Sequence, residues 1–215
     1  MSTSSTNRAS LALDLDGTLI DPQPRQVAVM AALVEDNATV EPLRPADFWS
    51  LKRDGLTTGE ALERLGVERA LAGELAARWS RAVEDVRWLR LDRLIPGVDE
   101  TLAELVEAGT RPAILTARRH EDRVRDQVTS LGLLRWCNGV QVVSPESAAE
   151  QKAAALEALG SRGFVGDTES DATAAELAGV AFAAVTTGQR AGEFLRARGL
   201  PAFDSLADAL RALPG

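Results

Sequence analysis

Two aspartates at the end of an apolar segment constrain most strongly how this chain of 215 residues can fold. Residues 10–15 form an apolar-rich run that ends in a turn signal, which predicts a buried strand. Asp14 and Asp16 have the same parity along it, so both side chains leave the strand on one side. At an effective dielectric constant of about 20, like charges about 4 Å apart repel by about 4 kcal/mol, unless a proton or cation lies between them. The alternative is a strand-to-turn junction whose aspartates cap a helix.

The composition narrows the class of protein. A hydrophobic fraction of 45% and a charged fraction of 26% are typical of a soluble globular chain. The net charge of −8 disfavours nucleic acid and anionic membranes as partners, and no apolar run is long enough to span a membrane. Cys137 is the single cysteine, so the chain has no internal disulfide, which predicts a reducing, cytoplasmic compartment. Its apolar neighbours predict that Cys137 is a small core residue. Residues 1–9 lack the apolar segment of a secretory signal and are predicted to be a disordered tail.

The spacing of the first two predicted strands indicates an inserted subdomain. The second strand is 111–116, although a whole βαβ unit needs only about thirty residues. The residues between these two strands that a simple crossover does not need have a helical pattern. Helices are predicted at 23–35, 45–52, 58–65 and 67–90, with Gly73 as a candidate break in the last. We therefore expect a core domain of residues 10–20 and 94–215 and a helical cap of residues 21–93.

The inserted helices are expected to bury a small core of their own. Five apolar residues of the last helix recur at helical spacing and suggest one buried stripe, namely Leu71, Leu75, Trp79, Val83 and Val86. Trp49, Trp79 and Trp88 are expected to fill this core rather than bind a ligand.

From residue 96 onward, strands alternate with helices. Strands are predicted at 111–116, 140–143, 163–167, 180–185 and 201–203, and helices at 98–107, 121–130, 148–159 and in the segments that follow. This alternation predicts an α/β fold, a Rossmann-like, mostly parallel sheet with helices on both faces. Ligands of such sheets bind beyond the carboxyl ends of the strands. Asp16, Thr116 and Asp167 each follow or close a strand, so we expect them to share one site.

Thr116 and Lys152 carry weaker signals. The Thr116 hydroxyl and the next amide can donate to a phosphoryl oxygen, although a threonine at a strand end is commonly structural. Lys152 opens a helix and can neutralise an anionic nucleophile and a phosphate. Its alternative is a solvated helix position, but the chain has only one other lysine, Lys52, among 24 cationic residues.

The segment Gly166–Asp171 carries a stronger signal. Asp167 leaves a strand end and Asp171 lies in the first turn of the next helix, so both can face one Mg²⁺, which prefers oxygen ligands. A capping box formed by Thr168 and Asp171 is the structural alternative, and it leaves Asp167 unexplained.

Four segments resemble, in order, the four motifs of the haloacid-dehalogenase-like superfamily. They are Asp14-Leu15-Asp16-Gly17-Thr18-Leu19, Thr116, Lys152 and Gly166–Asp171. A helical insert between the first two motifs is similar to the α-helical cap of the phosphoglycolate-phosphatase-like and β-phosphoglucomutase-like branch. The resemblance covers nearly the whole chain and implies a phosphoric monoester hydrolase.

The resemblance also implies a role for each motif residue. Asp14 attacks phosphorus and forms an aspartyl-phosphate, while Asp16 acts as general acid and then base, which requires a raised pKa. Mg²⁺ is the implied cofactor, and its implied ligands are Asp14, Asp16 (through its backbone carbonyl), Asp167 and Asp171. The implied phosphate-binding groups are Gly17, Thr18, Thr116, Ala117 and Lys152.

The cap is expected to close over the site and choose the substrate. Lys52 and Arg53, in the segment 51–57, are candidates to bind a second anionic group of the substrate. Their alternative is a solvated helix end. Arg118 is a candidate for the mouth of the site, and His120 is predicted to cap the following helix.

The acid at position 16 separates this chain from the superfamily's dehalogenases, which lack it and use no metal. A phosphomutase uses the same residues and stays an alternative. The alternatives from other classes are a receiver-type phospho-acceptor module, usually about half as long and without an insert, and a catalytically silent binding protein. We expect a hydrolase of a small phosphorylated metabolite that acts as a monomer or weak homodimer, without nucleic-acid or membrane partners.

Overall fold

The structure of the protein, a computed structural model, describes residues 11–37 and 43–214, so the tail predicted at residues 1–9 lies outside it. Within these residues, one sheet has the strand order β5-β4-β1-β6-β7-β8, and each neighbouring pair is parallel. Its strands are β1 (Leu11–Leu13), β4 (Ala113–Ala117), β5 (Val140–Val143), β6 (Gly163–Gly166), β7 (Ala181–Val185) and β8 (Ala202–Phe203). The predicted α/β fold with a mostly parallel sheet is confirmed.

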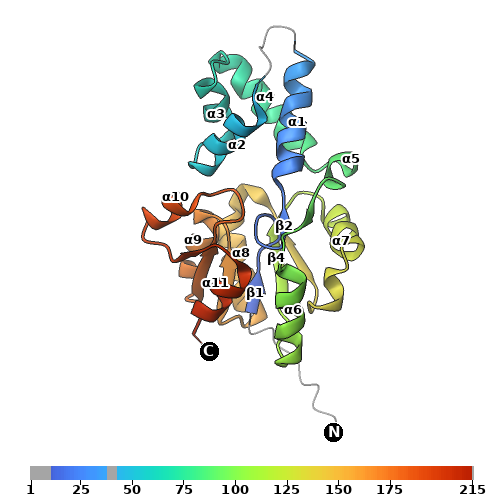
Figure 1. Cartoon of the computed structure of the whole chain (residues 1–215), viewed down its shortest axis with the longest axis vertical. Coiled ribbons are helices and arrows are strands. Elements are labelled where there is room, and N and C mark those ends of the chain that lie inside the picture. The colour runs from blue at the N-terminus through green and yellow to red at the C-terminus, as the bar shows by residue number, and fades with distance from the viewer. Residues whose placement is uncertain (1–10, 38–42, 215) are drawn as a thin grey trace.

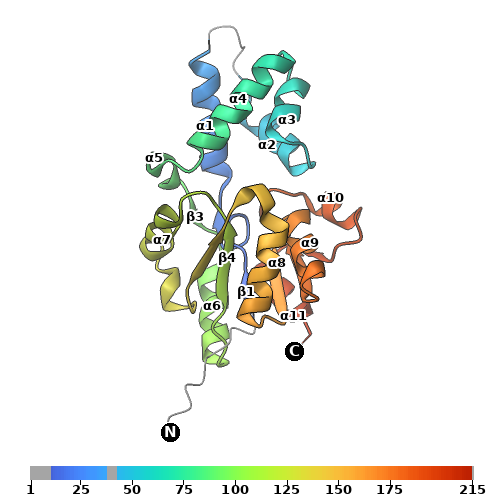
Figure 2. The same cartoon turned by 180° about the vertical axis from the view of Figure 1, so that it is seen from behind.

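Helices cover both faces of this sheet, because successive strand side chains point to opposite faces and are buried on both. Leu11 and Leu13 of β1 pack in one core with α6 (Val98–Glu107), α7 (Glu121–Ser130) and α11 (Leu206–Ala212). Ala12 faces the other core, with α8 (Ala148–Leu159) and α9 (Glu169–Leu177). Figure 1 shows α6 and α11 in front of the sheet, and Figure 2, from behind, shows α8 and α9.

The remaining elements of the core domain are short. They are α10 (Gly192–Arg196) and the 3₁₀ turns η1 (Leu133–Arg135) and η2 (Pro145–Ser147). Cys137 is buried in the core beside η1, as predicted, and burial raises the pKa of its thiol to about 12. His120 precedes α7 at the expected position, but its side chain makes no capping hydrogen bond. No helix in the described ranges is both long and apolar enough to cross a membrane.

The inserted helices stand together beyond one end of the sheet (Figure 1). They are α1 (Gln23–Glu35), α2 (Pro45–Arg53), α3 (Thr58–Arg64), α4 (Arg69–Ala82) and the short α5 (Val86–Leu89). Their own core contains Met30, Phe48, Leu62 and Leu75, each at most 2% exposed. Helical packing of an apolar stripe therefore gives the insert a separate core, as the sequence pattern indicates.

The predicted helix 67–90 differs from the observed one. Helix α4 continues through Gly73, because a glycine costs a helix only about 1 kcal/mol and strong helix formers surround it. The break falls after Ala82 instead, where the Val83 carbonyl accepts a hydrogen bond from the Arg25 guanidinium at 3.0 Å. Beyond this break the predicted stripe fails, and Val86 is 52% exposed.

A two-stranded antiparallel pair at the base of the insert was not predicted. Strand β2 (Ile20–Asp21) pairs with β3 (Arg93–Leu94), which joins the two chain segments that enter and leave the inserted helices. Strands of two residues are too short to show a periodic pattern. The pair lies at residues 20–21 and 93–94, where we place the boundaries between core and cap.

Candidate active site

The carboxyl ends of β1, β4 and β6 meet at the edge of the sheet that faces the inserted helices (Figures 1 and 2). A pocket of about 140 Å³ lies at this edge. The predicted residues that line it are Asp14, Asp16, Thr116, Ala117, Lys152, Asp167 and Asp171. The other lining residues are Ala148, Thr168, Ser170 and Gln189. The topology thus gathers all four motifs in one place, because parallel strands end at a common edge.

Three carboxylates and one ammonium group form what we call the acid cluster, made of Asp14, Lys152, Asp167 and Asp171. Lys152 Nζ donates to Asp14 Oδ1 and to Asp171 Oδ1, each at 2.6 Å. Carboxylate oxygens of the three aspartates lie within 4.8 Å of one another, and all four side chains are buried. The cluster therefore carries an excess of negative charge when its acids are ionised.

The pKa values report this imbalance. Burial raises the pKa of Asp14 to about 7, because the lowering by Lys152 offsets it only in part and Asp171 adds to it. Burial, then the charges of Asp14 and Asp171, raises the pKa of Asp167 well above its usual value. Burial alone would lower the pKa of Lys152, but Asp14 and Asp171 raise it above its usual range. Lys152 is thus a permanent cation, and the acids still lack enough positive charge.

The donor set fits a hard divalent cation. Among the described residues, no hydrogen bond reaches Asp14 Oδ2 or Asp167 Oδ1, so both oxygens can act as ligands. Mg²⁺ prefers such oxygens and would supply the missing positive charge. Both carboxylate oxygens of Asp171 already accept hydrogen bonds. Lys152 donates to Oδ1, and the Thr168 amide and hydroxyl donate to Oδ2 at 3.1 and 2.6 Å. The predicted capping box is therefore present, and Asp171 serves it and the acid cluster together.

Asp167 is held by the loop 186–190, which our sequence analysis missed. The Gln189 amide donates to Asp167 Oδ2 at 2.5 Å. Gly17, with φ +77°, and Gly188 close around this carboxylate, and a Cβ on either would lie 2.2 or 1.9 Å from Oδ2. Its place after a predicted strand could have identified this loop, since a loop that follows a strand ending at Val185 must emerge at the same edge of the sheet.

Asp16 belongs to a second group of buried charges, which we call the hinge network, made of Asp16, Arg25, Asp92 and Arg118. Arg118 holds the Asp16 carboxylate with two bonds, Nε to Oδ2 at 2.6 Å and Nη2 to Oδ1 at 2.7 Å. Arg25, on α1, bonds both Asp16 and Asp92, the latter at 3.0 Å. Two carboxylates face two guanidinium groups, so the network is balanced in charge.

The expected raised pKa of Asp16 is wrong for this arrangement. Burial alone would raise it, but Arg118 and then Arg25 lower the pKa of Asp16 to about 2. Arg118 was expected at the mouth of the site, and it is instead 5% exposed and paired with Asp16. Arg25 was missed, because an arginine within a helix pattern carries no local sign of a buried partner 67 positions away.

Several predicted ligand-binding groups have protein partners here. The amides of Gly17 and Thr18 donate to Ile20 and Leu15 carbonyls at 2.8 and 3.4 Å, so they turn the chain rather than point at the pocket. Lys52 is 7% exposed and bonds the Thr58 hydroxyl at 3.2 Å. The alternative, a solvated helix end, is therefore wrong for Lys52.

Arg53 likewise engages the protein. Its guanidinium bonds the carbonyls of Thr186 and Gly188 at 2.8 and 3.0 Å. Neither Lys52 nor Arg53 lines the pocket of the acid cluster, and their contact with substrate stays a prediction.

Comparison with known proteins defines the class. The family model of the haloacid dehalogenase-like hydrolases matches residues 10–179, and the chain belongs to that family. Its relatives include phosphoglycolate phosphatases from Pseudomonas syringae pv. syringae, 32% identical over 197 residues (85% of this chain and 71% of the relative), and from Vibrio vulnificus, 32% identical over 222 residues (93% of each). These findings confirm the predicted family and the predicted enzyme class, a phosphatase of the haloacid dehalogenase-like type.

Solved structures share the fold. A haloacid dehalogenase-like hydrolase from Streptococcus pneumoniae superposes with a TM-score of 0.73 at 18% identity, covering 95% of this chain and 97% of its own. At that identity the likeness concerns the fold alone, which supports the α/β core with inserted helices as the common architecture.

Proposed function

We propose that this protein is a Mg²⁺-dependent phosphomonoester hydrolase that acts on a small phosphorylated metabolite through an aspartyl-phosphate intermediate at Asp14. The observation that carries the proposal is the acid cluster. A nucleophile candidate is bonded to a buried lysine and placed beside two further acids whose charge is not compensated. That arrangement lies at the edge of the sheet where ligands of α/β proteins bind.

Asp14 is the proposed nucleophile. Lys152 holds its Oδ1 at 2.6 Å, and the carboxylate lines the pocket from which it would attack phosphorus. The lysine also offsets the charge of the incoming phosphate, and the Thr116 hydroxyl lines the same pocket as a donor to a phosphoryl oxygen. Attack splits a difficult hydrolysis into two easier steps, formation of the aspartyl-phosphate and its hydrolysis.

Asp14 and Asp167 are the proposed direct ligands of Mg²⁺, together with the backbone carbonyl of Asp16. Asp171 completes the set, directly or through water. Bound Mg²⁺ would stabilise negative charge on the phosphoryl oxygens. Because Asp14 and Asp167 each contribute a carboxylate oxygen to one buried cluster, removal of either acid should weaken cation binding more than removal of a surface acid.

Asp16 is the proposed general acid and base. It lies two residues from the nucleophile and lines the same pocket. As an anion held by Arg118 and Arg25 it cannot donate a proton. Proton donation to the leaving group therefore requires that the bound substrate, or a movement of the inserted helices that carry Arg25, release Asp16 from one of these arginines.

The proposed substrate class is a small phosphate ester with one further anionic group. The pocket is small, about 140 Å³. Relatives named phosphoglycolate phosphatase are 32% identical to this chain over the aligned residues, so phosphoglycolate is the first compound to test. Lys52 and Arg53 stay candidates for the second anionic group, and a cytoplasmic location stays a prediction.

A panel of phosphate esters, assayed with and without Mg²⁺, tests the proposal. Free phosphate released only with Mg²⁺ is the expected result, and phosphoglycolate should rank among the better substrates. An isomerised ester without free phosphate would replace the hydrolase by a phosphomutase. Stoichiometric labelling of Asp14 by acetyl phosphate without turnover would favour a phospho-acceptor module. No turnover and no labelling would overturn the proposal in favour of a silent binding protein.

A further inference from the structure

The loop 186–190 connects the inserted helices to the proposed cation site. On its inner side, the Gln189 amide bonds Asp167 Oδ2 at 2.5 Å, and Gly188 packs directly on the same carboxylate. The Thr187 hydroxyl also donates to the Gly17 carbonyl at 2.6 Å. The position of this loop therefore determines where the Asp167 carboxylate lies.

On its outer side, the same loop is held by the end of α2. Arg53 Nη2 donates to the Thr186 carbonyl at 2.8 Å, and Nη1 donates to the Gly188 carbonyl at 3.0 Å. In the reverse direction, the Ala191 amide donates to the Arg53 carbonyl at 2.9 Å. Arg53 is thus the side chain of the cap that spans the two carbonyls flanking Thr187, and its planar fork matches that task better than a lysine.

A parallel contact reaches the helix of Asp171. Arg190 donates to the Lys52 carbonyl at 3.1 Å, and it forms a two-bond ion pair with Glu169 at 2.6 and 2.8 Å. Glu169 is the first residue of α9, and Asp171 lies two residues further along that helix. Both acids of the fourth motif are therefore linked to the end of α2 through residues of one loop.

We propose that Arg53 is a positioning residue for the cation site: by holding the carbonyls of Thr186 and Gly188, it fixes the loop that orients Asp167, so that docking of the cap and cation binding strengthen each other. The inference rests on the proposed Mg²⁺-dependent function. It gives Arg53 a task other than substrate binding, because both of its terminal nitrogens are bonded to the core domain. Reciprocity follows from linkage, since cap docking and cation binding must favour each other equally.

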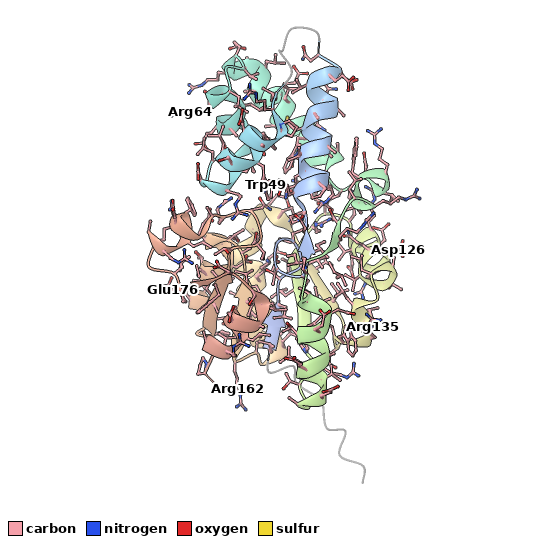
Figure 3. All side chains as sticks on the ribbon, in the orientation of Figure 1. Trp49, Arg64, Asp126, Arg135, Arg162 and Glu176 are labelled. Atoms are coloured by element: carbon pink, nitrogen blue, oxygen red, sulfur yellow. The ribbon has the colours of Figure 1, made fainter. Side chains whose placement is uncertain are left out.

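Calorimetric titration of the full chain with Mn²⁺, without substrate, is the first test. Arg53→Ala should weaken Mn²⁺ binding about fivefold or more, and Arg53→Lys should weaken it less, since an ammonium can reach one carbonyl. Arg64→Ala is the matched control, because Arg64 is exposed on the outer side of the cap (Figure 3) and should bind Mn²⁺ as the wild type does. Thermal unfolding of each variant verifies that it folds.

Kinetics separate positioning from substrate binding. If Arg53 positions the cation site, Arg53→Ala should raise the Mg²⁺ concentration that gives half-maximal rate and lower kcat. A raised KM for the ester with an unchanged Mn²⁺ affinity would overturn the inference and return Arg53 to the substrate. Wild-type protein that binds no Mn²⁺ would refute the proposed function itself, which is a different outcome.

Amide hydrogen exchange provides a measurement that needs no variant. The Ala191 amide bonds the Arg53 carbonyl and has no part in the acid cluster. Saturating Mg²⁺ should slow exchange at Ala191 about fivefold or more, because a filled cation site favours the docked cap. Exchange at Ala191 that is insensitive to Mg²⁺ would show that the two events are independent.

Discussion

Two groups of buried charges lie side by side in this protein, and they differ in balance. The acid cluster has three carboxylates and one ammonium, whereas the hinge network has two carboxylates and two guanidinium groups. Their first members, Asp14 and Asp16, are two residues apart. An unbalanced buried cluster needs a proton or a further cation, while a balanced one is a structural connection that is complete without a ligand.

The consequences appear in the two aspartates themselves. Burial raises the pKa of Asp14 to about 7, whereas Arg118 and Arg25 hold the pKa of Asp16 at about 2. The same residue type at the same strand end therefore has opposite behaviour. The comparison shows that the partner brought by the tertiary fold, and not the strand position, sets the chemistry of each acid.

The largest effect is expected at the nucleophile. Asp14→Asn should lower turnover by about 10⁴-fold or more, because removal of a covalent nucleophile abolishes the chemical step. The free energy of unfolding should stay the same or rise, since the change removes one of three crowded carboxylates. Phosphate release and guanidinium denaturation measure the two quantities. Turnover near that of the wild type would refute the assignment of Asp14.

A substitution in the hinge network should have the opposite effect on stability, which it should lower. Arg25→Met removes the guanidinium group that Asp16 and Asp92 share. It should lower the free energy of unfolding by about 3 to 5 kcal/mol. Burial already raises the pKa of Asp92 to about 6. Protonation below that pH removes its unpaired charge, so the loss should be smaller at pH 5 than at pH 8.

Denaturation of Arg25→Met at those two pH values, beside the exposed control Arg64→Met, measures this effect. The control should differ from the wild type by less than about 0.5 kcal/mol. A loss for Arg25→Met as small as that of the control would mean that the hinge network does not stabilise the fold.

A third buried charge, Lys52, extends the comparison to a cation that forms no ion pair with a carboxylate of the described residues. It is 7% exposed, bonds the Thr58 hydroxyl and lies 5.4 Å from the centre of the Trp79 ring. Burial, then Arg190, lowers its pKa from 10.5 to about 8. The folded state therefore binds fewer protons than the unfolded state between these values, and stability should rise with pH across that window.

Lys52→Met should remove this penalty, with a gain of up to about 3 kcal/mol at pH 7. The gain should shrink as the pH rises from about 8 to 10.5, because the wild-type lysine becomes neutral in both states. Urea denaturation at pH 7 and pH 10 provides the test. An equal loss of stability at both values would show that the burial of the Lys52 charge is not a penalty for the folded state.

The smallest effect is expected from the cation itself. Mg²⁺ at about 100 times its dissociation constant should raise the free energy of unfolding by about 2.7 kcal/mol, because it binds the folded acid cluster only. Asp167→Asn should lose most of this stabilisation, and Arg25→Met should keep it. Thermal unfolding with Mg²⁺ or with a chelator measures both. Equal stabilisation of wild type and Asp167→Asn would exclude Asp167 as a ligand.

The sequence by itself determined the parallel sheet, most of the helices and the members of the acid cluster. Strand 140–143 and helices 23–35, 98–107, 121–130 and 148–159 were predicted with the bounds that the structure has. This succeeded because apolar periodicity and turn residues act over a few neighbouring positions. Asp16, Thr116 and Asp167 could be assigned to one site because parallel strands end at a shared edge, and Asp14 and Lys152 joined them through the resemblance to the family motifs.

Only the tertiary structure decided which partners these residues meet. Arg25 and Asp92 are 67 positions apart, Arg118 and Asp16 are 102 apart, and Arg53 and Gly188 are 135 apart. No local pattern encodes such pairs, because an arginine that binds water and one that binds a buried carboxylate can look alike in the sequence. The balance of charge around Asp16, and the loop that holds Asp167, follow from how distant segments pack.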